Sequence, residues 1–383
     1  MDPRTHTGRL NRRLAMTSFG LSALALSGCP LSLRESTSAD TTEARLSNAA
    51  GEDALVRRVR ETLAAEKQHR GLSTMVNGAW QIFHGILAYG DQFEIDTPSG
   101  RKPALSYFIN GGTCDGFQPT LGDPLGDPAD GSTENSSNER RYGMKVALDP
   151  STKVGQGHRD QWLAVVAQAG VPLDATWNVG EHAFTVDDWV RQAELDVPLN
   201  YEAEFSWTLI PLSFYRGTDH QFTGRDGDRY STELLLESEI LRDLSASVCG
   251  GTHRLIGIAY ALRNRIAEGK PIAGVWGKAK SHLESAIELA RVNQNPDGSY
   301  STSYMHRTGW CHDLGEMLGT TGHVLEFLAV AADRSTLESE WVRRSATQLC
   351  DVLQRCRSVD LECGVLYHAL HGLAEYERRL SSS

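Results

Sequence analysis

Histidines placed beside apolar segments are the residues of this sequence with the clearest potential for chemistry. Each one precedes or opens a run of apolar residues that is long enough to form a helix, and small residues stand beside most of them. The set is His84, His158, His253, His323 and either His368 or His371. Neutral imidazole is the form that binds metals or acts as a base. A set that recurs in this way at irregular intervals indicates helical repeats with insertions, and it is a candidate for one shared site.

The stretch around His253 displays the pattern most clearly. It runs over residues 249–262 and reads CGGTHRLIGIAYAL. Gly250 and Gly251 permit the backbone angles of a tight turn, and Thr252 is a suitable helix N-cap. The residues that follow are apolar on nearly every side, which is typical of a buried helix. We therefore expect His253 at the start of an inner helix, where polar chemistry meets the core.

The rest of the chain supplies the elements that position these residues. An amphipathic segment at 53–70 is followed by an apolar segment at 79–89, and this alternation continues to the apolar segment at 362–376. Residues 112–157 are rich in Gly, Asp, Pro and Ser and predict a long loop insertion. The sequence therefore predicts an all-α domain over 53–383, built from irregular helical hairpins, with few strands.

One short motif connects this alternation to a known architecture. Residues 294–300, QNPDGSY, follow an expected outer helix and resemble the QW motif of squalene and oxidosqualene cyclases. Those enzymes share an α/α toroid with the protein prenyltransferases, in which a ring of outer helices surrounds a ring of inner helices. The resemblance therefore implies an α/α toroid. It does not extend to cyclisation, because residues 186–189, VDDW, lack the first aspartate of the Asp-x-Asp-Asp motif that protonates the substrate.

A second toroid family, the lanthionine cyclases, holds zinc with two cysteines and a histidine. Residues 310–313, WCHD, look partly like the Trp-Cys-x-Gly element of that family. Its Cys-His-Gly element has only an echo in His371 and Gly372, which have no adjacent cysteine. This resemblance implies the same fold and makes zinc a candidate cofactor.

A toroid would gather the N-termini of its inner helices at one end of the barrel. The positive ends of those helices would favour neutral imidazole. The candidate catalytic residues are His158, His253, His323 and Asp313, and the candidate zinc ligands are His253, His323, Cys249 and Cys311. The alternatives are that each histidine only caps a helix or fills a polar seam, that Cys249 is a small core residue, and that Asp313 only complements a helix dipole.

The N-terminus predicts export and membrane anchoring. Three arginines, Arg9, Arg12 and Arg13, precede a short apolar stretch at 14–26. The following residues, Leu26-Ser27-Gly28-Cys29, resemble the lipobox of bacterial lipoproteins, which implies cleavage before Cys29 and a lipid on that cysteine. Residues 1–28 are thus an expected signal peptide, and 29–52 an expected flexible tether to the membrane.

Charge and composition narrow the function further. The net charge of −11 argues against nucleic acid as a partner, and no apolar run is long enough to span a membrane. Six cysteines remain after Cys29, and the sequence does not select a disulfide pairing among them. Two functions follow: a metal-dependent enzyme acting on an envelope lipid or glycan in a central cavity, or a non-catalytic lipoprotein that binds a ligand or partner there.

Overall fold

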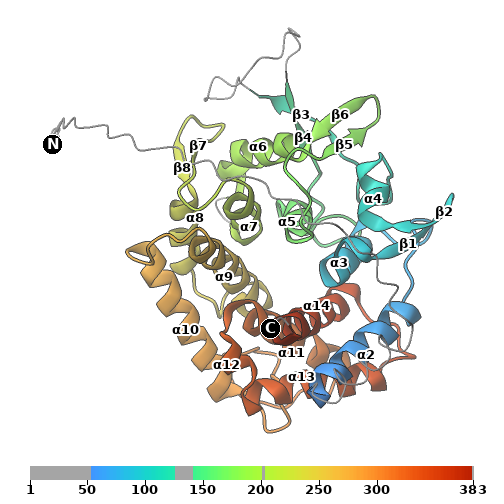
Figure 1. Ribbon diagram of the computed structural model, residues 1–383, viewed down its shortest axis with the longest axis vertical. Helices are drawn as coiled ribbons and strands as arrows, with labels where there is room; N and C mark the ends of the chain where they lie inside the picture. Colours follow the sequence, from blue (N-terminus) through green and yellow to red (C-terminus); the bar gives the residue numbers. More distant parts are fainter. Residues whose placement is uncertain (1–52, 126–140, 201–202, 382–383) are drawn as a thin grey trace, which may run out of the picture. The chain divides into compact units, whose positions relative to one another are not determined.

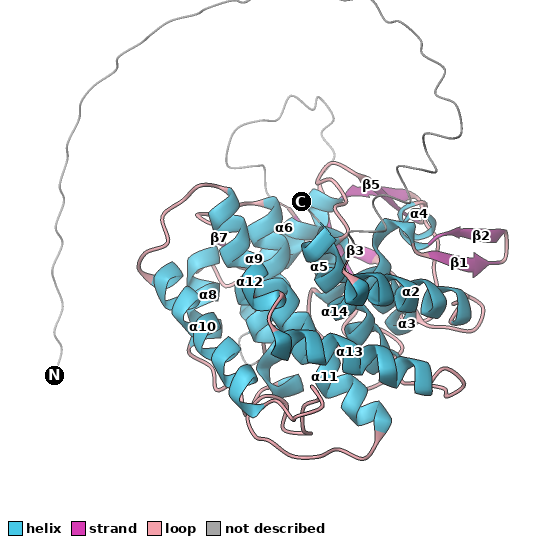
Figure 2. Cartoon of the chain, turned by 60° about the horizontal axis from the view of Figure 1, so that its bottom comes forward, coloured by secondary structure: helices cyan, strands magenta, loops and turns pink. Residues whose placement is uncertain are grey.

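Six apolar helices form the interior of the domain. The computed structural model describes residues 53–125, 141–200 and 203–381, so the expected signal peptide, Cys29 and the tether lie outside the described residues. The described part is mostly helical, as the sequence predicts (Figures 1 and 2). The apolar helices are α3 (Ala79–Tyr89), α5 (Gln161–Gln168), α7 (Ser206–Tyr215), α9 (Thr252–Ala267), α11 (Leu314–Ala331) and α14 (Cys363–Ser381). Each packs against the next along the chain, and α14 packs against α3.

The neighbouring apolar helices α7 and α9 run in the same direction. In the pair α7 and α9, a Cβ atom added to Gly257 would lie 2.8 Å from the Cα atom of Ser206. Seven residues further along both helices, Asn264 Nδ2 donates a hydrogen bond of 3.0 Å to Ser213 Oγ. Equal progress along both helices means that the two N-termini lie at the same end.

The pair α11 and α14 is held unusually close by glycines. A Cβ atom on Gly322 would lie 2.7 Å from the Cα atom of Ala369, and one on Gly372 would lie 2.8 Å from the backbone nitrogen of Glu326. Only glycine fits at such positions, because any side chain would collide with the facing backbone. This close approach brings the polar residues of the two helices into contact, as described below.

Amphipathic helices cover the apolar ones. They are α2 (Ala54–His69), α4 (Ala104–Ile109), α6 (Val186–Asp196), α8 (Thr232–Ile240), α10 (Val275–Asn293) and α13 (Glu340–Arg355), with a short α12 (Arg334–Leu337) before α13. In Figure 1, α10 and α2 lie on the outer side, where α10 packs on α9 and α2 packs on α14. Thr185 caps α6 by accepting a hydrogen bond from the backbone nitrogen of Asp188.

The 294–300 segment fastens α10 to α13. Gln294 Nε2 donates to Trp341 O at 2.7 Å and to Ser345 Oγ at 2.9 Å, both on α13. Tyr300 is fully buried, and its hydroxyl donates to Ala290 O of α10 at 3.1 Å. The segment therefore has a structural role at the junction of two outer helices.

The described residues contain four short antiparallel hairpins, which is more strand than the sequence indicates. They are β1–β2 (Glu94–Thr97 and Gly100–Pro103), β3–β4 (Thr120–Pro124 and Tyr142–Lys145), β5–β6 (Thr176–Val179 and His182–Thr185) and β7–β8 (Gln221–Thr223 and Arg229–Ser231). Three of them connect an apolar helix to the next amphipathic helix, as in α3–β1–β2–α4. The β3–β4 hairpin occupies part of the expected loop insertion at 112–157. Strands this short carry too few residues for a clear alternating pattern.

The apolar runs after His158 and His323 predict helices that open at residues 155–158 and 319–323, and both of these starts are wrong. Helix α11 begins at Leu314, so Gly319 to His323 lie inside the helix and do not open it. Helix α5 begins at Gln161, and His158 lies in the turn before it. In α11 the small residues serve the close contact with α14, a role that the sequence does not distinguish from a helix start.

Among the described residues, no helix is both long enough and apolar enough to cross a membrane.

Candidate metal centre

The histidines of successive apolar helices meet in one buried cluster. The ring centroids of His158 and His253 lie 5.0 Å apart, and those of His253 and His323 lie 5.5 Å apart. His323 lies 4.1 Å from His368, which in turn lies 5.2 Å from His84. All of these residues are buried except His158, which is half-buried. The structure thus brings together the histidines that the sequence singled out, including His323, whose expected place at a helix start is wrong.

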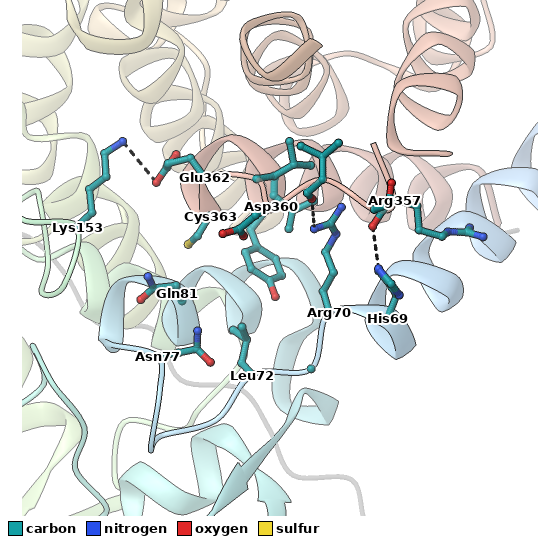
Figure 3. Close-up of a pocket in the computed structure, with 16 residues that line it drawn as sticks. His69, Arg70, Leu72, Asn77, Gln81, Lys153, Arg357, Asp360, Glu362 and Cys363 are labelled. Atoms are coloured by element: carbon teal, nitrogen blue, oxygen red, sulfur yellow. Dashed lines mark hydrogen bonds and ion pairs between the residues drawn. The ribbon is translucent and has the colours of Figure 1, made fainter. Parts of the chain in front are cut away.

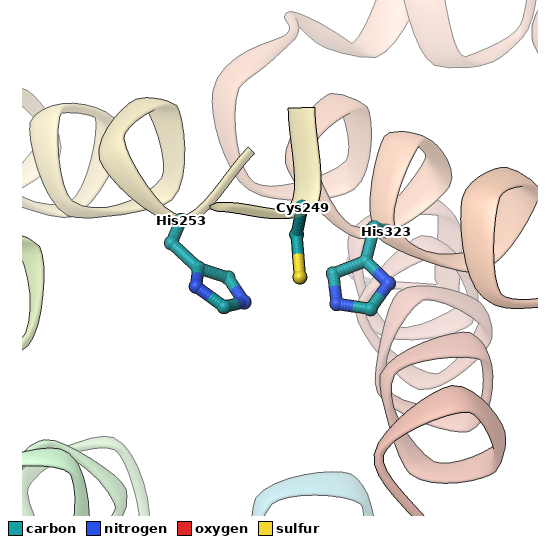
Figure 4. A group of neighbouring side chains, drawn as sticks. All are labelled: Cys249, His253 and His323. Carbon is teal, nitrogen blue, oxygen red and sulfur yellow. The ribbon is translucent and has the colours of Figure 1, made fainter. Parts of the chain in front are cut away.

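Cys249 completes a group of three metal-ligating side chains. The potential ligand atoms of Cys249, His253 and His323 all lie within 4.8 Å of one another. In Figure 4 the sulfur of Cys249 lies between the two imidazole rings, with His253 on α9 and His323 on α11. Thiolate sulfur and imidazole nitrogen are ligands that zinc prefers.

An unusual backbone places Cys249 in this position. Cys249, Gly250 and Gly251 are consecutive residues with positive φ, at 50°, 63° and 78°. This conformation is unfavourable for cysteine, and strain of this kind is concentrated at functional sites. Gly250 has a further constraint, because a Cβ atom there would lie 2.5 Å from the Cγ atom of Tyr304. Tyr304 itself has a φ of 52°, so two strained non-glycine residues meet at the site.

Hydrogen bonds orient both histidine ligands. His323 Nδ1 lies 2.8 Å from Gly319 O, and because a carbonyl can only accept, Nδ1 carries a proton, which leaves Nε2 with the lone pair when the ring is neutral. His253 Nδ1 lies 3.3 Å from Glu204 Oε1. His253 Nε2 is buried and has no hydrogen-bond partner among the described residues. A histidine that donates one N–H to a carboxylate or carbonyl and leaves its other nitrogen free is typical of a metal ligand.

Glu204 is the functional residue that the sequence analysis misses. Its Oε1 atom lies 2.7 Å from His158 Nδ1 and accepts a hydrogen bond of 2.9 Å from Trp207 Nε1, in addition to its contact with His253. Burial raises the pKa of Glu204, but the hydrogen bonds from His158 and His253 lower the pKa further, so that it lies well below its usual value. The only signal in the sequence is an acidic residue directly before an aromatic, apolar segment.

The electrostatics of the group favour a thiolate. Burial raises the pKa of Cys249, but its neighbours His323 and His253 have the larger combined effect and lower the pKa to about 3. Burial lowers the pKa values of His253 and His323, whereas Cys249 raises both and Glu204 raises that of His253; both values lie above the usual one. The thiolate is the form of cysteine that binds metal or acts as a nucleophile.

The size of the group fits a zinc ion. Zinc bound to one thiolate and two imidazoles requires ligand atoms about 3.3 to 3.6 Å apart, given bonds of about 2.3 Å to sulfur and 2.0 Å to nitrogen. The ligand atoms of the three side chains lie within 4.8 Å of one another, and they supply one ligand fewer than a closed structural site. Three protein ligands with an open fourth position are typical of catalytic zinc.

A second buried polar group lies beside His323 and consists of Glu326, His368 and His371. Glu326 of α11 accepts from His368 Nδ1 at 2.8 Å and from His371 Nδ1 at 2.6 Å. Burial lowers the pKa of His368 to about 4 despite the contact with Glu326, so this ring is neutral at pH 7. For His371, burial lowers the pKa, but the hydrogen bond to Glu326 and the charges of Glu326 and Glu375 have the larger combined effect and raise it. His368 thus presents a neutral ring to His323.

A surface cavity reaches Cys249 from outside. It has a volume of 560 Å³ and is lined by Cys249, Gly250, Ser303, Tyr304, His306 and Arg307, among others. His306 Nε2 lies 2.9 Å from Gly250 O, and this contact connects the segment that carries His306 to the strained turn. Burial, followed by the nearby Cys249, raises the pKa of Tyr304, so its hydroxyl stays protonated and can donate. A ligand in this cavity would lie beside Cys249, while His253 and His323 are buried behind it and do not line the cavity.

Two predicted site residues lie elsewhere. Asp313 is exposed and caps α11, where its Oδ1 accepts a hydrogen bond of 2.9 Å from the backbone nitrogen of Glu316. Cys311 is buried and its Sγ donates to Asp313 O at 3.4 Å, and it does not belong to the group of Cys249, His253 and His323. Asp313 therefore matches the capping alternative. Each of the six cysteines that the structure describes is a free thiol.

Comparisons with protein-family models, with curated proteins and with solved structures find no match.

Proposed function

We propose that the apolar and amphipathic helices form an α/α toroid, with the histidine cluster at its centre. Two observations support this architecture. Each apolar helix packs on the next and α14 packs on α3, and the contacts of α7 with α9 and of α11 with α14 are those of parallel neighbours. The amphipathic helices pack on their outer sides.

We further propose that the protein is a metal-dependent enzyme with zinc held by Cys249, His253 and His323. The observation that carries this proposal is the buried, unpartnered Nε2 of His253, which lies in a group of three ligand atoms within 4.8 Å of one another. An unsatisfied buried nitrogen is costly unless something binds it. Bound zinc would act there as a Lewis acid and activate water, so hydrolysis is the reaction class that we favour.

The surrounding residues have separate roles in this proposal. Glu204 orients His253 and offsets positive charge, while Gly319 O orients His323. Tyr304 contacts the turn that carries Cys249, and its hydroxyl would donate a hydrogen bond to a substrate in the adjoining cavity. His158 shares Glu204 with His253 and is a positioning residue.

We place this enzyme at the cell envelope, anchored through a lipid on Cys29, with an envelope lipid or glycan as substrate. The lipobox-like residues 26–29 and the tether-like composition of 29–52 support this location. Cys29→Ser should move the protein from the membrane fraction to the soluble fraction in a bacterial host that processes lipoproteins. Membrane retention of that variant would contradict the anchor.

Metal analysis of the purified protein tests the proposed chemistry. We expect one zinc per chain, lost in His323→Ala and in Cys249→Ser, while Cys311→Ser retains it. Circular dichroism of the same samples verifies that each variant folds. Folded wild-type protein that takes up no zinc, cobalt or other divalent metal would contradict the proposal and favour the non-catalytic binding lipoprotein.

A thiol nucleophile is a second candidate, favoured by the strained φ of Cys249 and its lowered pKa. In that case His253 or His323 would act as the base, as in other cysteine–histidine pairs. Rapid alkylation of Cys249 by iodoacetamide at pH 6, unaffected by added zinc, would favour this candidate. Protection of Cys249 by zinc would favour the metal site.

A further inference from the structure

The cavity at Cys249 has an unusual lining for this acidic chain. The chain contains 49 acidic and 38 basic residues. The lining nevertheless includes no carboxylate and no aliphatic side chain. It offers the hydroxyl groups of Thr302, Ser303 and Tyr304 instead, whereas the lining hydroxyls of Ser245 and Ser247 already donate to Asp243.

Three other cavities in the described part of the chain differ in both respects. The cavity in Figure 3 is lined by Asp360 and Glu362 together with several leucines. A third cavity contains Glu375 beside Ile86 and Leu87, and a fourth contains several acidic residues and a leucine. Among these four cavities, only the one at Cys249 has a polar lining without carboxylates.

Arg307 supplies the positive charge of this cavity. Its side chain is exposed and forms no ion pair with any residue that the structure describes, whereas its backbone is fixed by a hydrogen bond from Ser301 Oγ to Arg307 O at 2.5 Å. His306 contributes less, because Asp243 lies near it. A guanidinium presents paired N–H donors that match the oxygens of a phosphate or carboxylate.

We propose that this cavity binds an oxyanion group, phosphate or carboxylate, of a hydrophilic substrate, with Arg307 as its main contact. The proposal rests on the proposed function, which it deepens by naming the substrate class. Hydroxyl groups would complete the hydrogen bonding of the oxyanion, and Arg307 would hold it beside Cys249. Within the broader class of envelope lipids and glycans, the absence of aliphatic lining favours an anionic glycan or a headgroup over an acyl chain.

Calorimetric titration with inorganic phosphate tests this proposal, with acetate and glucose as further probes. We expect the zinc-loaded protein to bind phosphate or acetate, or both, and to ignore glucose; the preferred ion identifies the oxyanion. Arg307→Gln should weaken that binding at least tenfold, and Arg307→Lys should weaken it less, because it keeps the charge but loses the paired donors. The matched control is Arg291→Gln, which removes an exposed arginine on α10 and should leave binding unchanged.

The outcomes separate this proposal from the metal site. Failure of both ions to bind, or binding unaffected by Arg307→Gln, overturns the oxyanion site even when zinc is present at one per chain. If the protein takes up no metal but still binds the oxyanion through Arg307, the oxyanion site is supported and only the metal centre is contradicted.

Discussion

His253 is the residue on which the proposed site depends most. Its Nδ1 atom faces the carboxylate of Glu204, and its Nε2 atom faces Cys249 and His323. The contact of Nδ1 with Glu204 orients the ring and leaves Nε2 available to a metal ion. The same ring packs against Trp207, so its position is also set by packing.

Replacing the carboxylate behind His253 should weaken metal binding without removing a ligand. We expect Glu204→Gln to lower zinc affinity about 10- to 100-fold, because His253 loses its charged hydrogen-bond acceptor. Competition with a chromogenic chelator measures this change. Glu362→Gln is the control, since Glu362 also accepts a hydrogen bond from a tryptophan, Trp80, but lies in a different cavity. Equal affinities of the wild type and Glu204→Gln would exclude this role for Glu204.

The strained turn predicts a second effect at the residue scale. Gly250→Ala should destabilise the fold by about 2 to 4 kcal/mol, because it combines a positive φ with a collision against Tyr304. Gly180→Ala has a similar φ of 59° but open space around it, so it should cost only about 1 kcal/mol. Urea denaturation of both variants gives the comparison. Similar losses would mean that contact with Tyr304 does not constrain the turn.

Residue types could be predicted from the sequence better than residue contacts. The histidines stand out because they recur beside apolar segments, and the structure brings them together. The sequence could not distinguish the role of Glu204 from that of Asp313. Both are acidic residues near helix starts, and only the direction of each side chain separates a buried partner of His253 from an exposed helix cap.

At the scale of elements, the contact between α11 and α14 aligns His323 and Glu326 with His368 and His371. Gly322→Ala should destabilise the protein by about 2 to 3 kcal/mol, because the new Cβ atom would meet the backbone of Ala369 at 2.7 Å. Gly319→Ala is a matched control on the same helix. Its Cβ atom would meet only the side chain of Val365, at 3.2 Å, and the gain in helix propensity should offset that cost. Thermal unfolding distinguishes the two, and a larger loss for Gly319→Ala would contradict this account of the contact.

Helices were easier to predict than their connections. The segment at 79–89 matches α3, because its apolar run is bounded by glycine and by a polar turn. The hairpins were missed because each strand has only three to five residues. The start of α11 was misplaced because glycine and threonine within a closely packed helix resemble a break.

For the whole molecule, buried neutral histidines should make the fold sensitive to acid. Burial, reinforced by the nearby His368, lowers the pKa of His84 to about 3. The unfolded chain binds a proton near pH 6.5, whereas the folded chain does not until about pH 3, so stability should fall as the pH falls from 6.5 towards 3. The loss from His84 alone is about 1.4 kcal/mol per pH unit in this range.

His84→Asn isolates this contribution, because its amide can still donate to Trp80 O as His84 Nδ1 does. The variant should lose about 2 kcal/mol less than the wild type between pH 6.5 and pH 5, measured by urea denaturation. His182→Asn changes an exposed histidine and serves as the control. Parallel pH profiles for His84→Asn and the wild type would show that His84 does not contribute to the acid sensitivity.

The central claim is a zinc centre built from one cysteine and two histidines. X-ray absorption at the zinc edge of the purified protein tests it most directly. We expect one sulfur ligand at about 2.3 Å and two imidazole nitrogens at about 2.0 Å, with a light atom in the fourth position. His323→Ala and Cys249→Ser, which should not retain zinc, should not give this spectrum, whereas Cys311→Ser should give the spectrum of the wild type. A spectrum with no sulfur ligand, or one unchanged in His323→Ala and Cys249→Ser, would contradict the claim.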